Sequence, residues 1–174
     1  TSPFLPRILR AMSQLKLDSR DLRILSVLSR EGRITKSELA ARVNLSATPC
    51  WERLKRLEEA GIITGYRAEV ELRKIAPHVT VFVVAEIENH RAERMRAFEE
   101  TMAGYDEIIA CWALGGGFDY LLQVVTRDID SYQRLIDRIL ASDLGLSRYF
   151  TYIVTKQVKE SAPLPEAILR MTEE

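Results

Sequence analysis

Small polar and positively charged side chains are concentrated in residues 46–56, at spacings that place them on the outside of a helix. Cys50, Leu54 and Leu57 recur at i, i+4 and i+7 in the same stretch, which predicts that they form its buried face. Arginine and lysine on such a helix can neutralise phosphates, whereas short polar side chains near its start can hydrogen-bond base edges. The residues expected to contact DNA in this way are Lys36, Ser46, Ala47, Thr48, Glu52, Arg53, Lys55 and Arg56.

These residues are expected to have two different roles in DNA binding. Basic side chains would mostly anchor phosphates, and residues at the N-terminal end of the helix would meet the bases. Replacing Arg56 by Ala should then weaken binding to all DNA sequences and reduce the salt dependence by about one phosphate contact. The expected anchors are Lys36, Arg53, Lys55 and Arg56, and the expected base contacts are Ala47, Thr48 and Glu52.

A second distinctive stretch reads Gly-Gly-Gly-Phe-Asp-Tyr, residues 115–120. A hairpin needs one or two glycines, whereas three in a row open a backbone surface whose N–H groups can receive a carboxylate. Asp119 could hold an ammonium group beside it, so the pair would suit a zwitterion such as an amino acid. The sequence leaves open the alternative that this is a mobile loop with Asp119 as a cap. Replacing Asp119 by Ala should abolish ligand-induced changes and leave DNA binding largely intact.

The basic stretch needs a scaffold, and the residues before it predict a helix-turn-helix. Thr35 and Glu38 form a capping box for a first helix, and Asn44 tolerates the left-handed conformation of the turn. Ser46 is a good N-cap for the second helix, and Gly61 suits the position just after its end. An ordinary helical hairpin with solvated charges is the alternative.

The neighbours of this hairpin favour the DNA-binding interpretation. An amphipathic helix precedes it, begun by Asp18 with Asp21 three residues later and carrying Leu22, Ile24, Leu25 and Leu28. Residues 62–66 follow it as an expected strand and turn, the wing of a winged helix. Residues 1–67 hold 13 Lys/Arg against 7 Asp/Glu, a difference of +6, and residues 68–174 hold 12 against 18, a difference of −6. This charge split makes the N-terminal half suitable for binding phosphate.

The composition suits two small globular domains in 174 residues, with 47% hydrophobic and 29% charged residues. No apolar run approaches the ~18 residues of a membrane span, so no membrane partner is expected. Cys50 and Cys111 are both expected to be small buried hydrophobes in a reduced compartment, which favours a cytoplasmic location. Neither lies in a CxxC or near a histidine, so no metal or other cofactor is expected.

The second half predicts a βαββαβ order, an antiparallel sheet with both helices on one side, and hence an α+β chain. The expected strands are residues 79–87, 108–114, 120–126 and 148–154, and the expected helices are residues 91–102 and 129–140. The expected domains are residues 17–66 for DNA binding and 79–159 for ligand binding and oligomerisation, joined by a linker, 67–78, in which Val70 and Leu72 leave room for a strand. Residues 1–16 would be an arm or tag remnant, with Met12 the expected initiator, and 160–174 a tail.

The runs LDSRDLRIL, GRITKSELAARVNLSATPCWERLKRLEEAGIITGYRAEV and GGGFDYLLQVV resemble the Lrp/AsnC family of feast/famine transcription regulators, from about Leu17 to Lys159. The resemblance implies an N-terminal winged helix-turn-helix and a C-terminal effector-binding domain of ferredoxin-like βαββαβ form. It also implies dimers that associate through the sheets, with assembly to tetramers or octamers, and small amino-acid-like effectors at subunit interfaces. The effector-binding residues expected here are Gly115, Gly116, Gly117, Phe118, Asp119, Tyr120 and Thr151.

The sequence departs from the family pattern at two places. Trp51 stands where relatives commonly have a smaller aliphatic residue, and it is expected to pack on the wing or, alternatively, to touch the sugar-phosphate backbone. In residues 115–120, many relatives carry one more bulky or acidic residue, so a less crowded pocket is expected. The stretch SRYFTYIVTKQVK resembles family members linked to ectoine and diaminobutyrate breakdown.

Three other functions are alternatives to a regulator with an amino-acid-like effector. An enzyme is disfavoured because His78 and His90 have no partner carboxylate or cysteine at useful spacing and no P-loop or serine-hydrolase element is present, so no catalytic residue is expected. An amino-acid-sensing subunit of an enzyme is disfavoured by the basic N-terminal half. A chromosome-organising protein of low sequence preference would bind random and promoter DNA alike.

Overall fold

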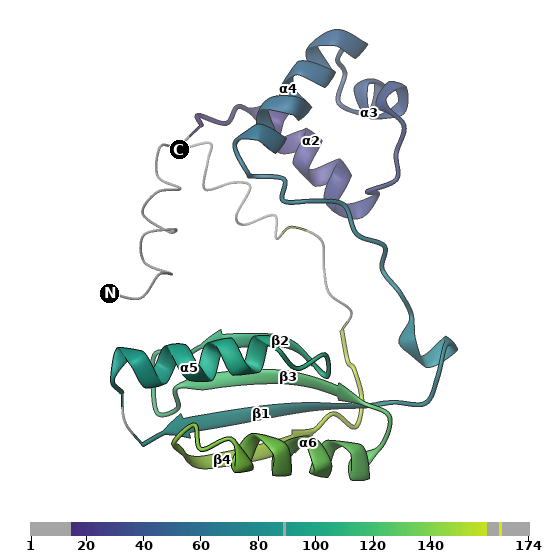
Figure 1. The fold of residues 1–174 in the computed structure, drawn as a ribbon. Helices are drawn as coiled ribbons and strands as arrows, with labels where there is room; N and C mark the ends of the chain where they lie inside the picture. The colour runs from purple at the N-terminus through teal and green to yellow at the C-terminus, as the bar shows by residue number, and fades with distance from the viewer. Residues whose placement is uncertain (1–14, 89, 160–163, 165–174) are drawn as a thin grey trace. The chain divides into compact units, whose positions relative to one another are not determined.

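The computed structural model describes residues 15–88, 90–159 and 164, and the chain divides into two compact units (Figure 1). The breaks lie between Val70 and Glu71 and between Gln157 and Val158, so the described residues after Gln157 belong with the N-terminal unit. The first break lies inside the segment 67–78 that the sequence assigns to a linker. Most of the expected arm, residues 1–16, and of the expected tail, residues 160–174, lies outside the described residues. Each unit is described by itself.

The N-terminal unit contains three helices: α2 (Ser19–Arg30), α3 (Lys36–Arg42) and α4 (Ala47–Glu59). Capping boxes begin α2, at Asp18 and Asp21, and α3, at Thr35 and Glu38, as predicted. The turn between α3 and α4 uses Asn44 at φ 54°, the left-handed conformation expected for it. The predicted helix-turn-helix and the helix before it are confirmed.

One apolar cluster holds the three helices together. Its buried members come from all of them, so no helix can leave the unit without exposing apolar surface. Cys50 is among them, as predicted. The buried members are Ile24, Leu25, Leu39, Ala40, Val43, Cys50, Leu54 and Leu57.

The predicted strand of the wing is wrong for this chain. Residues 61–70 contain no strand, and the room left for one at Val70 and Leu72 is occupied from Leu72 to Lys74 by a single 3-10 turn, η1. Apolar residues favour a strand only where a second strand can pair with them, and this segment has no paired neighbour in the described part of the chain. Tyr66, at the end of the expected wing, instead donates a hydrogen bond to Glu58 of α4 over 2.8 Å.

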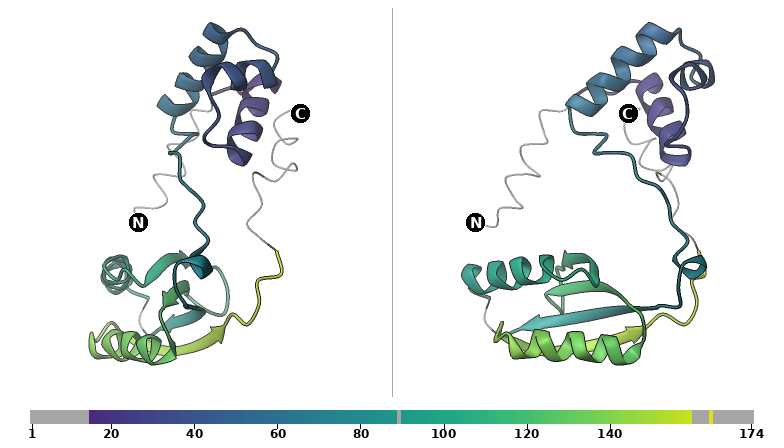
Figure 2. Two further views of the ribbon diagram at one scale, coloured as in Figure 1. Left: turned by 90° about the vertical axis from the view of Figure 1, so that its right-hand side faces the viewer. Right: turned by 45° about the vertical axis from the view of Figure 1, so that its right-hand side comes forward.

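The C-terminal unit is the predicted four-stranded antiparallel sheet with two helices (Figure 2). Its strands, in the spatial order β2-β3-β1-β4, are β1 (Val79–Ile87), β2 (Ile108–Ala113), β3 (Tyr120–Thr126) and β4 (Leu146–Ile153). Helices α5 (Ala92–Ala103) and α6 (Ile129–Ala141) form the two crossovers of the βαββαβ order. The predicted fold class, α+β with a ferredoxin-like domain, is confirmed.

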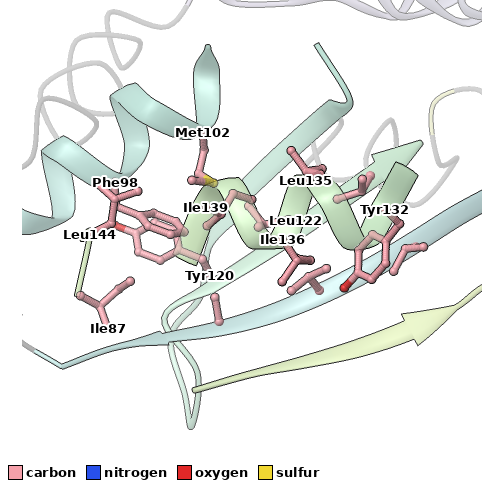
Figure 3. Packing of buried hydrophobic residues seen from close by; sticks show 14 residues of the cluster. Ile87, Phe98, Met102, Tyr120, Leu122, Tyr132, Leu135, Ile136, Ile139 and Leu144 are labelled. Carbon is pink, nitrogen blue, oxygen red and sulfur yellow. The ribbon is translucent and has the colours of Figure 1, made fainter. Parts of the chain in front are cut away.

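Both helices pack on one face of this sheet. Phe98 and Met102 of α5 and Leu135 and Ile139 of α6 gather over the central strands, where Tyr120 is fully buried (Figure 3). The Phe98 and Tyr120 rings lie 4.6 Å apart between centroids. Burial alternates along β3 and, from Thr80 onward, along β1, so every second residue of these strands points to the opposite face.

That opposite face is mostly apolar, with Gln123 beside Phe82, and has neither helix of the unit over it. In the register of the sheet, Val84 pairs with Leu121 and Phe150, and Phe82 pairs with Tyr152. Trp112, Phe150 and Tyr152 keep 46%, 42% and 56% of their surface exposed. The open face, as we call it, consists of Phe82, Val84, Trp112, Leu121, Phe150 and Tyr152.

The prediction of a buried Cys111 is wrong, because its side chain is exposed. Cys111 lies on β2, which is an edge strand and has a neighbour on one side only. The sequence shows that this residue is in a strand but not where in the sheet that strand lies.

Candidate DNA-binding surface and effector site

The outer side of α4 carries a stripe of exposed residues. Thr48, Glu52 and Lys55, which the sequence predicts to meet DNA, recur at i, i+4 and i+7 and are all exposed. Trp51 stands at i+3 in the same stripe and is 40% exposed. We call Thr48, Trp51, Glu52 and Lys55 the outer stripe. Ser46 and Ala47 lie exposed at the start of the helix, and the Ser46 side chain makes no capping hydrogen bond.

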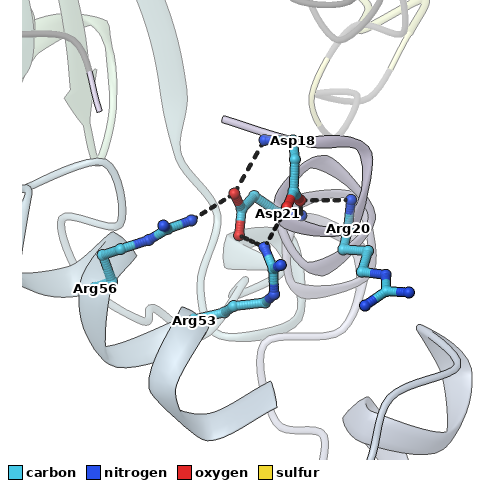
Figure 4. Close-up of polar contacts among 5 residues, drawn as sticks. All are labelled: Asp18, Arg20, Asp21, Arg53 and Arg56. Atoms are coloured by element: carbon cyan, nitrogen blue, oxygen red, sulfur yellow. Dashed lines mark hydrogen bonds and ion pairs between the residues drawn. The ribbon is translucent and has the colours of Figure 1, made fainter. Parts of the chain in front are cut away.

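Arg53 and Arg56 lie on a different side of α4 and form ion pairs with carboxylates at the start of α2 (Figure 4). Arg53 donates to the buried carboxylate of Asp21 over 2.8 Å and lies 2.7 Å from Asp18, and Arg56 donates to Asp21 over 2.6 Å. The expectation that both residues mainly anchor phosphates stays a prediction, and any such contact would have to be made by guanidinium groups that also bind Asp21. Their guanidinium groups are held against α2, where they neutralise a carboxylate that has no solvent contact.

The sequence could not reveal this cluster, because Asp21 is separated from Arg53 by 32 residues and from Arg56 by 35. The sequence identifies Asp21 only as the second member of a capping box, a role it also fills by accepting from the Asp18 N–H. Hydrogen bonds from the Asp21 N–H, the Arg53 side chain and the Arg20 N–H lower the pKa of Asp18. The α2 N-terminus is thereby tied to the middle of α4.

Lys36, at the first turn of α3, meets the outer stripe. Its ammonium nitrogen lies 3.2 Å from the centroid of the Trp51 ring, a cation–π contact between the two helices of the helix-turn-helix. Trp51 is thus neither in the apolar cluster of this unit nor packed on a wing strand.

In the C-terminal unit, Gly115, Gly116 and Gly117 form the turn between β2 and β3. None of the three has a positive φ, and a methyl group added to any of them would meet no atom within 4 Å. Neither the backbone conformation nor crowding within the chain therefore requires glycine here. This contrasts with Gly61 and Gly145, whose φ values of 69° and 70° favour glycine.

The side chains that follow the glycines have structural roles. The Asp119 carboxylate is 16% exposed; it accepts from the Ile87 N–H over 2.8 Å and lies 2.8 Å from the His90 Nε2. Tyr120 is buried and donates to Glu99 over 2.9 Å. Thr151 hydrogen-bonds Tyr132 of α6.

Phe118 is the one aromatic side chain of the turn that reaches the open face. Its ring lies edge-on to Phe150, with centroids 5.6 Å apart. The Arg148 guanidinium lies 5.7 Å from the Phe118 centroid and 5.6 Å from the Phe150 centroid, and it donates to Glu86 over 2.7 Å. Sequence reasoning missed Glu86, Arg148 and Phe150, which are cross-strand neighbours on β1 and β4 and have no recognisable spacing in the chain.

The described residues contain no group of three or more potential metal ligands. Among them there is also no helix long and apolar enough to cross a membrane. The geometry defines a class of protein, namely one with a helix-turn-helix DNA-binding unit joined to a βαββαβ unit that has an open apolar sheet face.

Comparison with known proteins identifies the family. Residues 17–64 match a winged helix-turn-helix DNA-binding family, and residues 80–164 match the Lrp/AsnC ligand binding domain. The chain belongs to the Lrp/AsnC family of transcription regulators and is not an enzyme. The resemblance stated from the sequence is confirmed.

Individual relatives agree with this assignment. The transcriptional regulatory protein DoeX of Halomonas elongata is 52% identical over 145 residues, which cover 83% of this chain and 92% of the relative. The DNA-binding transcriptional activator DecR of Escherichia coli K12 is 34% identical, over 86% of this chain and 98% of that one. A Neisseria meningitidis regulator solved as a complex with L-Met has a TM-score of 0.81 and 33% identity, covering 88% of this chain and 99% of that chain.

Proposed function

We propose that this regulator binds specific DNA sites as a homodimer or larger assembly and that a small amino-acid-like effector bound at the Gly115–Gly117 turn modulates this binding. The observation that carries the effector site is the turn itself. Glycine is not needed there for any reason within the chain, so the space it leaves open suits a molecule from outside. The L-Met found with the Neisseria meningitidis relative supports an amino acid as the class of effector.

The charges for such an effector lie beside the turn. Exposed backbone N–H groups of the glycines suit a carboxylate, and Glu86 and Arg148 offer one charge of each sign within reach of Phe118. Asp119 remains part of the proposed site, but mainly as the residue that fixes the turn to the end of β1, through Ile87 and His90. Tyr120 and Thr151 belong to it only as supports from the helix-covered side.

Dimerisation is proposed through the open face. A second copy of the chain is the partner best suited to it, because Trp112, Phe150 and Tyr152 stay exposed on a sheet face that neither helix covers. Exposed apolar patches of this kind are typical of protein–protein contacts. The Glu86–Arg148 pair and Phe118 lie at one end of this face, so an effector there would be bound close to the contact between subunits.

DNA binding is proposed through the outer stripe of α4, helped by Lys36, Ser46 and Ala47. The stripe points away from the apolar cluster, as the recognition helix of a helix-turn-helix must do to enter the major groove. A two-fold dimer would read a pseudo-palindrome whose half-sites are roughly one helical turn apart. We propose that the protein is cytoplasmic, because the relatives named above are bacterial and bacterial DNA lies in the cytoplasm.

One experiment tests the main proposal and separates the alternatives. The full chain is titrated with duplexes selected from a random pool and with scrambled duplexes, with and without each amino acid. We expect selected DNA to bind at least about a thousandfold more tightly than scrambled DNA. Equal affinities would favour a chromosome-organising protein, and no DNA binding at all would favour a sensing subunit. A thermal-shift screen with amino acids identifies the effector, because a ligand bound only by the folded state raises the melting temperature.

A further inference from the structure

Trp51 is an exposed aromatic residue that does not contribute to the apolar cluster of the N-terminal unit. It lies in the outer stripe with Thr48 and Lys55, beside the buried face of α4 that Cys50 and Leu54 form. At 40% exposure its indole leaves a large apolar surface in water, which is unfavourable.

The apolar cluster of the N-terminal unit does not depend on this side chain. Ile24, Leu39 and Leu57 close the cluster at 0–2% exposure, and Trp51 is not one of its members. The contact that the structure does give Trp51 is Lys36, whose ammonium lies over the ring at 3.2 Å. That contact pins the ring from the α3 side, because a cation is attracted to the face of an indole. The ring is thus oriented before any DNA arrives.

We infer that Trp51 is a specificity-determining residue that makes an apolar contact with the 5-methyl group of a thymine in the major groove. The inference rests on the docking of α4 proposed above. Thymine is the base that displays a methyl group in this groove, and apolar side chains recognise it there. Trp51 offers a far larger apolar surface for such a contact than the single methyl group of Thr48, and Glu52 offers only a carboxylate, which suits a donor such as cytosine N4.

Lys36 has the complementary role. Its ammonium is held on the ring of Trp51, at the first turn of α3, where it positions a positive charge beside the outer stripe. A phosphate contact from Lys36 carries no sequence information. The two residues therefore predict different defects: loss of sequence preference for Trp51 and loss of general affinity for Lys36.

The first test uses fluorescence. Trp51 and Trp112 are the chain's two tryptophans, and they lie in different units. Titration of the full-length protein with its selected duplex should change the tryptophan emission, and this change should vanish in Trp51→Phe, which keeps only Trp112. If adding DNA changed the emission of Trp51→Phe as much as that of the wild type, the inference would be overturned, because the change would then not come from Trp51.

The second test isolates the methyl group. Thymines of the selected duplex are replaced one at a time by uracil, which removes only the 5-methyl group. One position in each half-site should lose about tenfold in affinity for the wild-type protein and nothing for Trp51→Ala. Trp51→Ala itself should lose about tenfold on the selected duplex and less than about twofold on scrambled DNA. The same uracil penalty in both proteins would contradict a Trp51–methyl contact.

Two controls keep the result interpretable. Circular dichroism melting should give the same transition for wild type and Trp51→Ala, since the side chain lies outside the apolar cluster. Lys36→Met should weaken binding to scrambled DNA and reduce the salt slope by about one, which Trp51→Ala should not do. Because Lys36 also orients the Trp51 ring, this variant should lose part of the preference for selected DNA as well. If wild-type protein itself did not distinguish selected from scrambled DNA, the proposed function would fail; if it did and the uracil scan were flat, only the role of Trp51 would fail.

Discussion

The carboxylate of Asp21, which is fully buried, accepts a hydrogen bond from the guanidinium of Arg53 over 2.8 Å and so joins the first turn of α2 to the middle of α4. This relationship makes the orientation of the recognition helix depend on a charge at another helix's N-terminus. A buried ion pair of this kind is costly to break, because removing one partner leaves the other charge without compensation.

Replacing Asp21 by Asn is therefore expected to destabilise the N-terminal unit by about 3 kcal/mol, at the low end for buried pairs because Arg53 keeps some contact with solvent. Calorimetric unfolding of the full chain measures this. Arg42→Ala is the matched control, since Arg42 and Glu31 form an exposed ion pair in the same unit. It should cost less than about 1 kcal/mol. Equal losses in the two variants would mean that the buried cluster has no special weight.

Replacing Gly116 by Ala should leave the fold unchanged, because an added methyl group meets no atom within 4 Å and the backbone needs no positive φ. The same substitution should raise the effector concentration needed for a given thermal shift at least about fivefold, because the added methyl group occupies space proposed for the effector. Gly145→Ala is the contrasting variant: at φ 70° it should destabilise the chain without bearing on the effector. Effector response that survives in Gly116→Ala would argue against this turn.

Replacing Asp119 by Ala tests whether a lost response to the effector reflects a lost contact with the effector or a destabilised turn. Its carboxylate accepts the Ile87 N–H at 16% exposure, so the variant should lose about 1–3 kcal/mol of stability as that donor is left unpaired. Chemical denaturation measures the loss. The sequence-based expectation of an altered response with an intact fold is thereby refined. A variant as stable as wild type would restore Asp119 as a group free to hold an effector.

Replacing Tyr152 by Glu should convert the protein to a monomer, because a carboxylate would be buried without a partner in the proposed contact between open faces. Light scattering coupled to size-exclusion chromatography gives the mass. Leu140→Glu is the control, since Leu140 is 46% exposed on α6, away from the sheet. It should keep the wild-type mass; monomers in both variants would point to general destabilisation.

Stability in acid should depend on Asp128, the N-cap of α6. Hydrogen bonds from the Ser131 side chain and N–H, with Arg127 adding to them, lower its pKa to about 2. Because the folded pKa lies below the unfolded value of 3.8, the stabilisation is complete above that value and is lost as the pH falls toward 2. Asp128→Asn keeps a capping side chain but cannot titrate. The stability difference between wild type and this variant should shrink from pH 4 to pH 2, and a constant difference would contradict the role.

Local signals were enough to place most elements of this fold. The capping pairs Asp18–Asp21 and Thr35–Glu38 began helices where they were predicted to begin, and the expected strands 79–87 and 120–126 coincide with β1 and β3. These features depend on neighbours within one turn or on alternation along one strand, so the chain carries them in short windows. The predicted strand at residues 62–66 is absent because a strand needs a paired neighbour and the described residues supply none, although residues 17–64 match a winged helix-turn-helix family.

What the sequence by itself determined was the pair of units, their order and the family, because hydrophobic period, caps and motifs are local properties. The tertiary structure alone decided which basic residues of α4 are held against another helix. It places Arg53 and Arg56 on Asp21 of α2, leaves Lys55 exposed in an ion pair with Glu59 of its own helix, and places Lys36 over the Trp51 ring. It also decided that the glycines of the turn are exposed to solvent whereas Tyr120, which follows them, is buried in the core. Such partnerships join residues far apart in the chain, and only packing determines which of them meet.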